Sequence, residues 1–201
     1  MSRRAAGWVL AAALLLVIGG LAWWWQAGRG GGRTPRRGAA EGAAGAPTER
    51  HAFDLYFPAS GGGLRGERRE LQVSEAPKDR IRKVLEALLA GPAAAPAAAP
   101  PGASPAGLVR PFPPEVKLGS VELSADGTAF VDLRWADRED PPESGSTEEI
   151  QRVYSLVDSL ALNVPQVNRV VLLWNGTQRI TFSGHLDTSR PLLPDRTLLA
   201  P

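Results

Sequence analysis

The sequence predicts an α+β domain, a two-layer sandwich with two helices on one face of a mostly antiparallel sheet, placed after an N-terminal transmembrane helix. Three observations predict it. The chain opens with a long uncharged apolar stretch, segments with alternating apolar residues occur in pairs joined by short turns, and two segments with three-and-four apolar spacing stand between those pairs. Strand pairs separated by helices favour helices layered on an antiparallel sheet.

Residues 1–27 are predicted to form the transmembrane anchor. No charge occurs from Ala5 to Ala27, and about 20 apolar residues suffice to cross a hydrocarbon core of roughly 30 Å. The Trp23–Trp25 run at the far end suits a headgroup region, and the flank after it is a poor cleavage site, which favours an anchor over a signal peptide. The arginines that follow would by themselves keep the C-terminal side cytoplasmic, so charge leaves the orientation open.

Residues 28–48 are predicted to form a flexible linker, because they are mostly Gly, Ala, Arg and Pro and contain no large apolar side chain. Residues 49–201 have the length of one domain, interrupted by a Pro/Ala-rich surface insertion at 92–107. Residues 1–47 carry six Arg and one Glu, which leaves the folded part slightly acidic. We therefore expect no nucleic-acid binding. The chain has no cysteine, which excludes disulfides and thiolate chemistry.

The first half of the domain is predicted to contain a hairpin and a helix. Phe53, Leu55 and Phe57 alternate with polar residues as in a half-buried strand, and "RELQVS" provides a second strand after the glycines of 61–63. Apolar residues then recur at helical spacing from Ile81 to Leu89. Gly91 and Pro92 end this helix.

The second half is predicted to contain two hairpins around a second helix. Asp126-Gly127 suits a type I′ turn that sets Val121 and Leu123 against Val131 and Leu133. A Ser146-x-x-Glu149 capping box begins a helix that ends before Pro165. "VNRVVLLW" and "TQRITF" flank Asn175-Gly176, and the first of these strands is apolar on both faces, which is typical of a central strand.

Five segments, taken in order, resemble the GerMN domain of bacterial sporulation and spore germination proteins. They are "KVLEALLAGP", "GLVRPFPPEVKLGSVEL", "GTAFVDLRW", "IQRVYSLVDSLALNVPQVNRVVLLWNG" and "FSGHLDTSRPL", within residues 52–193. The resemblance implies a compact extracytoplasmic interaction domain with envelope proteins as partners, self-association included, and no established catalytic residue. The positions that match the family pattern are Gly91, Pro92, Pro113, Pro114, Asp132, Gly184, Asp187 and Pro191.

His185 and Asp187 are the strongest candidates for chemistry, because residues two apart on an extended chain point to the same side. However, no Gly-x-Ser-x-Gly elbow supplies a nucleophile, and two ligands are one fewer than a catalytic zinc usually takes from its protein. We expect Asp187 instead to cap a turn by accepting amide hydrogens from Thr188, Ser189 or Arg190.

The remaining motifs also have simpler interpretations. Five carboxylates in 137–143 lack the spacing and turn glycine of a calcium loop, and the glycines of 61–63 precede no phosphate-binding helix. Trp135 and Trp174 could stack on sugars, but strand ends usually bury such rings in part. We therefore expect no catalytic residue, cofactor or metal, and a non-catalytic envelope scaffold. The alternative is a peptidoglycan- or small-ligand-binding module.

Overall fold

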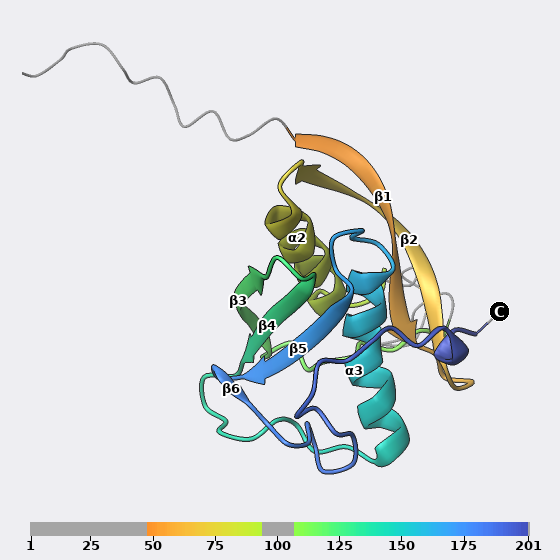
Figure 1. Ribbon diagram of the computed structural model, residues 1–201. Coiled ribbons are helices and arrows are strands. Elements are labelled where there is room, and N and C mark those ends of the chain that lie inside the picture. The colour runs from red at the N-terminus through yellow and green to blue at the C-terminus, as the bar shows by residue number, and fades with distance from the viewer. Residues whose placement is uncertain (1–47, 94–106, 201) are drawn as a thin grey trace, which may run out of the picture. The chain divides into compact units, whose positions relative to one another are not determined.

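The computed structural model describes residues 48–93 and 107–200 (Figure 1). The predicted anchor at 1–27, nearly all of the linker and most of the Pro/Ala-rich insertion lie outside the described residues. Among the residues that it does describe, none of the helices is long and apolar enough to cross a membrane.

The described chain folds into two sheets and two helices, so the α+β class is confirmed. The elements are β1 (Thr48–Pro58), β2 (Leu64–Ser74), α2 (Pro77–Leu89), β3 (Lys117–Leu123), β4 (Thr128–Arg134), α3 (Ser146–Ala161), β5 (Arg169–Trp174), β6 (Thr177–Gln178) and a short 3-10 turn (Arg196–Leu198). The prediction of one mostly antiparallel sheet is wrong, because the strands form two separate sheets. β1 and β2 form a separate antiparallel hairpin, and β3-β4-β5-β6 form a mixed sheet in which β4 and β5 are parallel.

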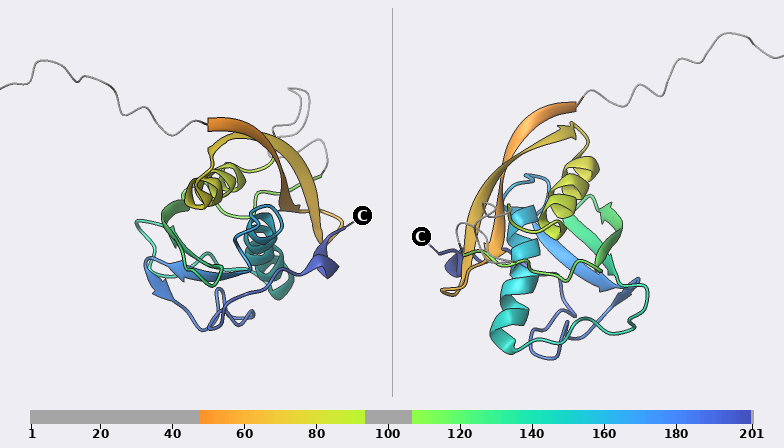
Figure 2. Two further views of the ribbon diagram at one scale, coloured as in Figure 1. Left: turned by 45° about the horizontal axis from the view of Figure 1, so that its top comes forward. Right: turned by 180° about the vertical axis from the view of Figure 1, so that it is seen from behind.

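The two helices lie between the hairpin and the four-stranded sheet, which makes three layers where the sequence predicted two (Figures 1 and 2). α3 contacts both β1 and β5, and α2 contacts both β2 and β3. α3 lies on the four-stranded sheet because it connects β4 to β5, and parallel strands need such a helical crossover. The hairpin then covers the other side of the helices as the third layer. As predicted, β5 lies inside its sheet, between β4 and β6.

Polar side chains on α3 and in the turn just after it form hydrogen bonds with the free edge of β1. Ser155 Oγ donates to the carbonyl of Tyr56 over 2.5 Å, and Ser159 Oγ accepts the Tyr56 amide over 2.9 Å. Asn163 accepts the amide of Asp54 and donates to its carbonyl, over 2.9 and 2.7 Å. Ser155 and Ser159 are four apart and therefore share one face of α3, and Asn163 follows four residues later in the turn after the helix. They satisfy the backbone of β1 as a neighbouring strand would.

The two predicted turns differ in geometry. Gly127 has a φ of 81° but Asp126 is not in the left-handed region, so the type I′ turn is wrong there. The loop closes instead through Gly127 N to Ser124 O and Ser124 N to Thr128 O. Val121 does face Val131, whereas Leu123 faces Ala129. At the second turn Asn175 and Gly176 both have positive φ, 48° and 81°, as a two-residue hairpin loop requires.

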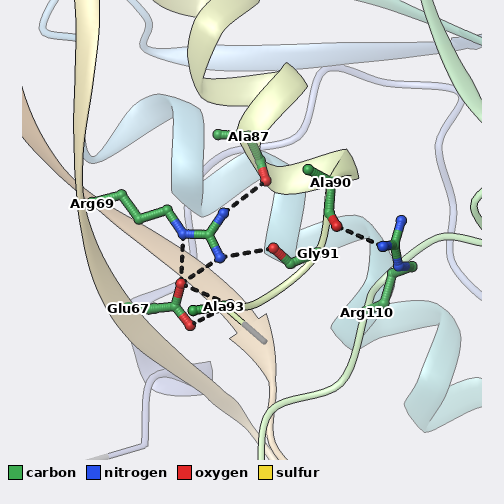
Figure 3. A network of polar contacts seen from close by, with 7 residues as sticks. All are labelled: Glu67, Arg69, Ala87, Ala90, Gly91, Ala93 and Arg110. Atoms are coloured by element: carbon green, nitrogen blue, oxygen red, sulfur yellow. Dashed lines mark hydrogen bonds and ion pairs between the residues drawn. The ribbon is translucent and has the colours of Figure 1, made fainter. Parts of the chain in front are cut away.

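Two arginines close the C-terminal end of α2, as Figure 3 shows. Arg69 donates to the carbonyls of Ala87 and Gly91 over 3.3 and 2.8 Å, and Arg110 to those of Leu89 and Ala90 over 2.8 and 2.6 Å. Glu67 holds the Nε of Arg69 at 2.5 Å and also accepts the amide of Ala93 at 3.0 Å. These bonds satisfy the last helical carbonyls and fix the chain where it enters the insertion.

Replacing Arg69 with alanine should therefore lower the free energy of unfolding by about 1–3 kcal/mol, because helix carbonyls and the Glu67 carboxylate lose charged hydrogen bonds. The guanidinium also stacks on Phe57, 5.5 Å from the ring centre. Urea unfolding followed by circular dichroism measures the change. Arg68→Ala on the exposed side of β2 is the matched control and should stay within about 0.5 kcal/mol. Equal effects of the two substitutions would contradict the role of Arg69.

Candidate functional site

A depression in the described part of the chain lies beside the segment that contains His185. It has a volume of about 580 Å³ and is open to solvent. Its walls are the Asp140–Glu143 loop and the chain from Thr177 through Gly184. Arg179 and Asp140 form an ion pair in this wall. Pro141, Ile180 and Phe182 form the apolar part of the lining, and Ser183 and Gly184 belong to the loop at 183–186.

Glu149 holds this 183–186 loop in place. Its completely buried carboxylate accepts the backbone amides of Ser183, His185 and Leu186 over 2.7, 2.9 and 3.1 Å. The same carboxylate meets Nδ1 of His185 at 2.9 Å. One side chain on α3 thus satisfies three amides of a segment more than 30 residues away in the sequence.

The predicted capping box at Ser146 and Glu149 is therefore wrong. The N-cap of α3 is Gly145, without a side-chain cap, and the Glu149 amide bonds the Gly145 carbonyl. A capping-box glutamate stands three residues after the N-cap, and the actual start of the helix puts Glu149 four residues after it. Its side chain turns inward to the distant loop instead of back to its own helix.

The environment of Glu149 keeps its carboxylate ionised. Burial alone would raise its pKa, but the hydrogen bonds from Ser183, Leu186 and His185 outweigh burial and lower the pKa. An ionised carboxylate saturated with donors is suited to holding a loop and poorly suited to donating a proton. Arg152, one turn further on, is also buried and donates to the carbonyls of Pro111 and Pro142, both over 2.9 Å.

The structure does not bring His185 and Asp187 together as a reacting pair. The His185 ring bonds to Glu149, while Asp187 is exposed. Asp187 Oδ1 accepts the amide and the hydroxyl of Ser189 over 2.9 and 2.6 Å, so the predicted turn cap is confirmed with Ser189 as its donor. These hydrogen bonds lower the pKa of Asp187.

The eight residues matched to the family pattern are spread over the fold instead of lining one site. Asp132 is buried in β4, where its oxygens accept from Arg134 Nε and from the amide of Gly176, both over 2.7 Å. Gly91 and Gly184 have φ of 88° and 109°, which favour glycine. Pro92 follows the end of α2, Pro113 and Pro114 lead into β3, and Pro191 precedes the Leu192–Val170 bridge.

Of the two tryptophans in the described residues, one is buried and the other is partly covered. Trp174 is buried and packs edge-on against Phe182 with ring centres 5.8 Å apart. Trp135 is partly buried, and the Arg138 guanidinium lies 4.8 Å from its ring centre. In the acidic loop at 137–143, Asp140 pairs with Arg179. Gly61–Gly63 join β1 to β2, as expected of a hairpin loop.

Sequence reasoning missed the polar residues that α3 buries. Besides Glu149 and Arg152, Asp158 is fully buried, and its Oδ1 accepts the amide of Asp195 over 2.9 Å. The signal that the sequence offered for them was their position along the helix. These residues lie on helical turns next to apolar residues such as Val153 and Val157, where a charge needs a specific partner.

The chain resembles known proteins in sequence and in fold. A profile of the family described as "Germane: Sporulation and spore germination" matches residues 54–180. The first GerMN domain of the sporulation protein GerM from Bacillus subtilis is 19% identical, with a TM-score of 0.51 over 73% of this chain and 98% of that domain. No curated protein sequence matches.

Two further solved structures have lower TM-scores. The tandem GerMN domains of the same Bacillus subtilis protein are 17% identical, with a TM-score of 0.49 over 73% of this chain and 46% of theirs, so this chain spans less than half of the tandem. A presumed lipoprotein from Clostridium perfringens is 19% identical, with a TM-score of 0.48 over 72% of this chain and 87% of that one.

Proposed function

Because the chain belongs to the family of sporulation and spore germination proteins, as its resemblance to GerMN domains predicted, we propose that it is a non-catalytic interaction module of the cell envelope. An N-terminal transmembrane segment at 1–27 anchors it, and residues 48–201 face away from the cytoplasm. The arginines after the anchor favour the opposite orientation, but charge bias has little influence on long translocated domains.

One observation carries the non-catalytic part of the proposal. Four buried charged side chains in the described residues, Asp132, Glu149, Arg152 and Asp158, each bond to the backbone of another segment. Charges in an active site are normally aimed at a cavity that admits a substrate. Here they join α3 and β4 to loops, which is the arrangement expected of a rigid scaffold.

A second candidate is supported by the open depression beside Arg179. It combines an ion pair, backbone groups and exposed Ile180 in a volume of about 580 Å³, which lies in the range of small-molecule sites. A peptidoglycan fragment or another small polar ligand could occupy it. In this alternative the domain binds the cell wall through the 140–143 and 177–184 walls.

Crosslinking in intact cells followed by affinity purification of the full-length chain tests the two candidates. A scaffold should capture specific envelope proteins in amounts unaffected by Arg179→Ala, since that change alters the depression alone. A wall-binding module should instead sediment with purified peptidoglycan, and Arg179→Ala should weaken that binding. Sedimentation with peptidoglycan in the absence of protein partners would reject the scaffold proposal.

A further inference from the structure

Three side chains of metal-ligating type gather at the open end of the β1–β2 hairpin. Glu49 and His51 are two apart on β1, in line with buried Phe53, so they continue the inner face of the strand beyond the core. Glu49 lies opposite Val73 on β2, and Glu75 follows Val73 by two residues. The pairing of the hairpin therefore brings a carboxylate, an imidazole and a second carboxylate to one place.

The distances suit a shared ion. One oxygen of each glutamate and one ring nitrogen of His51 all lie within 4.8 Å of one another, and His51 Nε2 is 3.7 Å from Glu49 Oε2. Zinc binds such ligands at about 2.0–2.2 Å, so the three ligand atoms must move closer to one another when an ion binds. The side chains of Glu49 and Glu75 are 73% and 81% exposed and can rotate to do so.

A separate observation, an unpaired ring nitrogen of His51, also points to an ion at this place. Its Nε2 atom is buried and has no hydrogen-bond partner within the described ranges, while 37% of the side chain as a whole is exposed. Buried polar atoms in proteins are normally paired, so an orphaned imidazole nitrogen facing a carboxylate needs an explanation. A cation between the two would provide one, because the lone pair of neutral imidazole and the carboxylate oxygen would both bind to it.

Arg80 already positions the third ligand. It holds Glu75 Oε1 at 3.1 Å and donates through Nε to the carbonyl of Ser74 over 3.3 Å. This keeps the Glu75 carboxylate beside the hairpin and leaves its second oxygen for an ion. Outer partners of this kind commonly orient carboxylate ligands in metal sites.

We propose that Glu49, His51 and Glu75 bind a divalent transition-metal cation of the zinc class. The imidazole favours zinc over magnesium and calcium, which take oxygen ligands. Three protein ligands leave a fourth position for water or for a group from a binding partner. The ion would join the beginning of β1 to the turn before α2, and its presence does not depend on the proposed scaffold function.

Isothermal titration of the full-length chain in mild detergent at pH 7.5, with zinc chloride as the probe, tests the site. We expect one zinc per chain and no comparable binding of magnesium. Because outer-shell partners alone are worth about 10- to 100-fold in metal affinity, His51→Ala and Glu75→Gln should each weaken binding at least about tenfold. His185→Ala, at the other histidine of the chain, is the matched control and should bind zinc as the wild type does.

Absence of saturable zinc binding to the wild-type chain would reject the site, as would undiminished binding by His51→Ala or loss of binding in His185→Ala. Circular dichroism of each variant reports whether it is folded. If His51→Ala fails to fold, Glu75→Gln decides, since it retains size and hydrogen bonding while replacing a charged ligand by a neutral one.

Discussion

Replacing Glu149 with alanine should lower the free energy of unfolding by about 3–5 kcal/mol, because three backbone amides lose their acceptor at a cost of about 1–3 kcal/mol each. The substitution leaves the amides of Ser183, His185 and Leu186 without their acceptor and opens a cavity under the loop that they form. Each unpaired amide adds its own cost of desolvation. Chemical unfolding of the full-length chain in detergent at pH 7 measures the loss.

Two further substitutions separate the hydrogen bonds from the charge. Glu149→Gln keeps one acceptor oxygen and should fall between wild type and alanine. Glu139→Ala, on the exposed loop before α3, removes a carboxylate with no role in the fold and should change stability by less than about 0.5 kcal/mol. A Glu149→Ala protein as stable as Glu139→Ala would show that the 183–186 loop does not depend on its buried anchor.

Acid should weaken the same anchor. The hydrogen bonds lower the pKa of Glu149 in the folded protein, so its contribution is fully present above the pKa of the unfolded chain, near 4. That contribution is lost as the pH falls through the lower, folded value. The wild-type protein should therefore lose stability below about pH 4 more steeply than Glu149→Gln does.

The local elements of the fold could be predicted from the sequence because their signals are local. Alternation at Phe53, Leu55 and Phe57 and the spacing of Ile81, Val84 and Leu85 record which face of each element is buried. The pairing of the elements leaves no such signal. That β4 joins β5 in parallel, and that β1 and β2 form their own sheet, follows from tertiary contacts made by both faces of the helices.

The candidate site shows the same limit more sharply. Asp187 and Ser189 are two residues apart, so their turn could be predicted from the sequence. Glu149 stands among apolar residues of the helix, which indicates a buried charge, but its position also fits the capping box. Its actual partners are at least 34 residues away. Similarly, Glu75 meets His51 only because of the register of the hairpin. A local sequence pattern can therefore identify a candidate residue, but which distant residue it contacts depends on the tertiary fold.

Asp158→Asn should make the protein more stable at pH 8 and remove a pH dependence that the wild type shows between about pH 4 and 7. Asp158 is fully buried on α3. Its Oδ1 accepts the amide of Asp195, and its Oδ2 has no partner among the described residues. Its pKa is raised to about 6: burial is the largest cause and the Asp195 charge adds to it, while the hydrogen bond from the Asp195 amide and the charge of Arg196 act in the opposite direction.

The direction of the effect follows from this raised pKa. The folded protein binds the proton of Asp158 more tightly than the unfolded chain does, so the stabilisation is complete below the unfolded value near 4 and is lost as the pH rises through about 6. At pH 8 the ionised carboxylate is therefore less favourable than a neutral one by up to about 3 kcal/mol. Asparagine retains an oxygen for the Asp195 amide and carries no charge at any pH.

Unfolding free energies of wild type and Asp158→Asn, measured from pH 4 to 8, decide the matter. The difference between the two proteins should grow as the pH rises through 6, because only the wild type ionises there. Asp137→Asn removes an exposed carboxylate and should follow the wild-type profile throughout. If Asp158→Asn instead followed the wild-type profile, the carboxylate would not be the titrating group, and its buried contact with the C-terminal segment would be indifferent to charge.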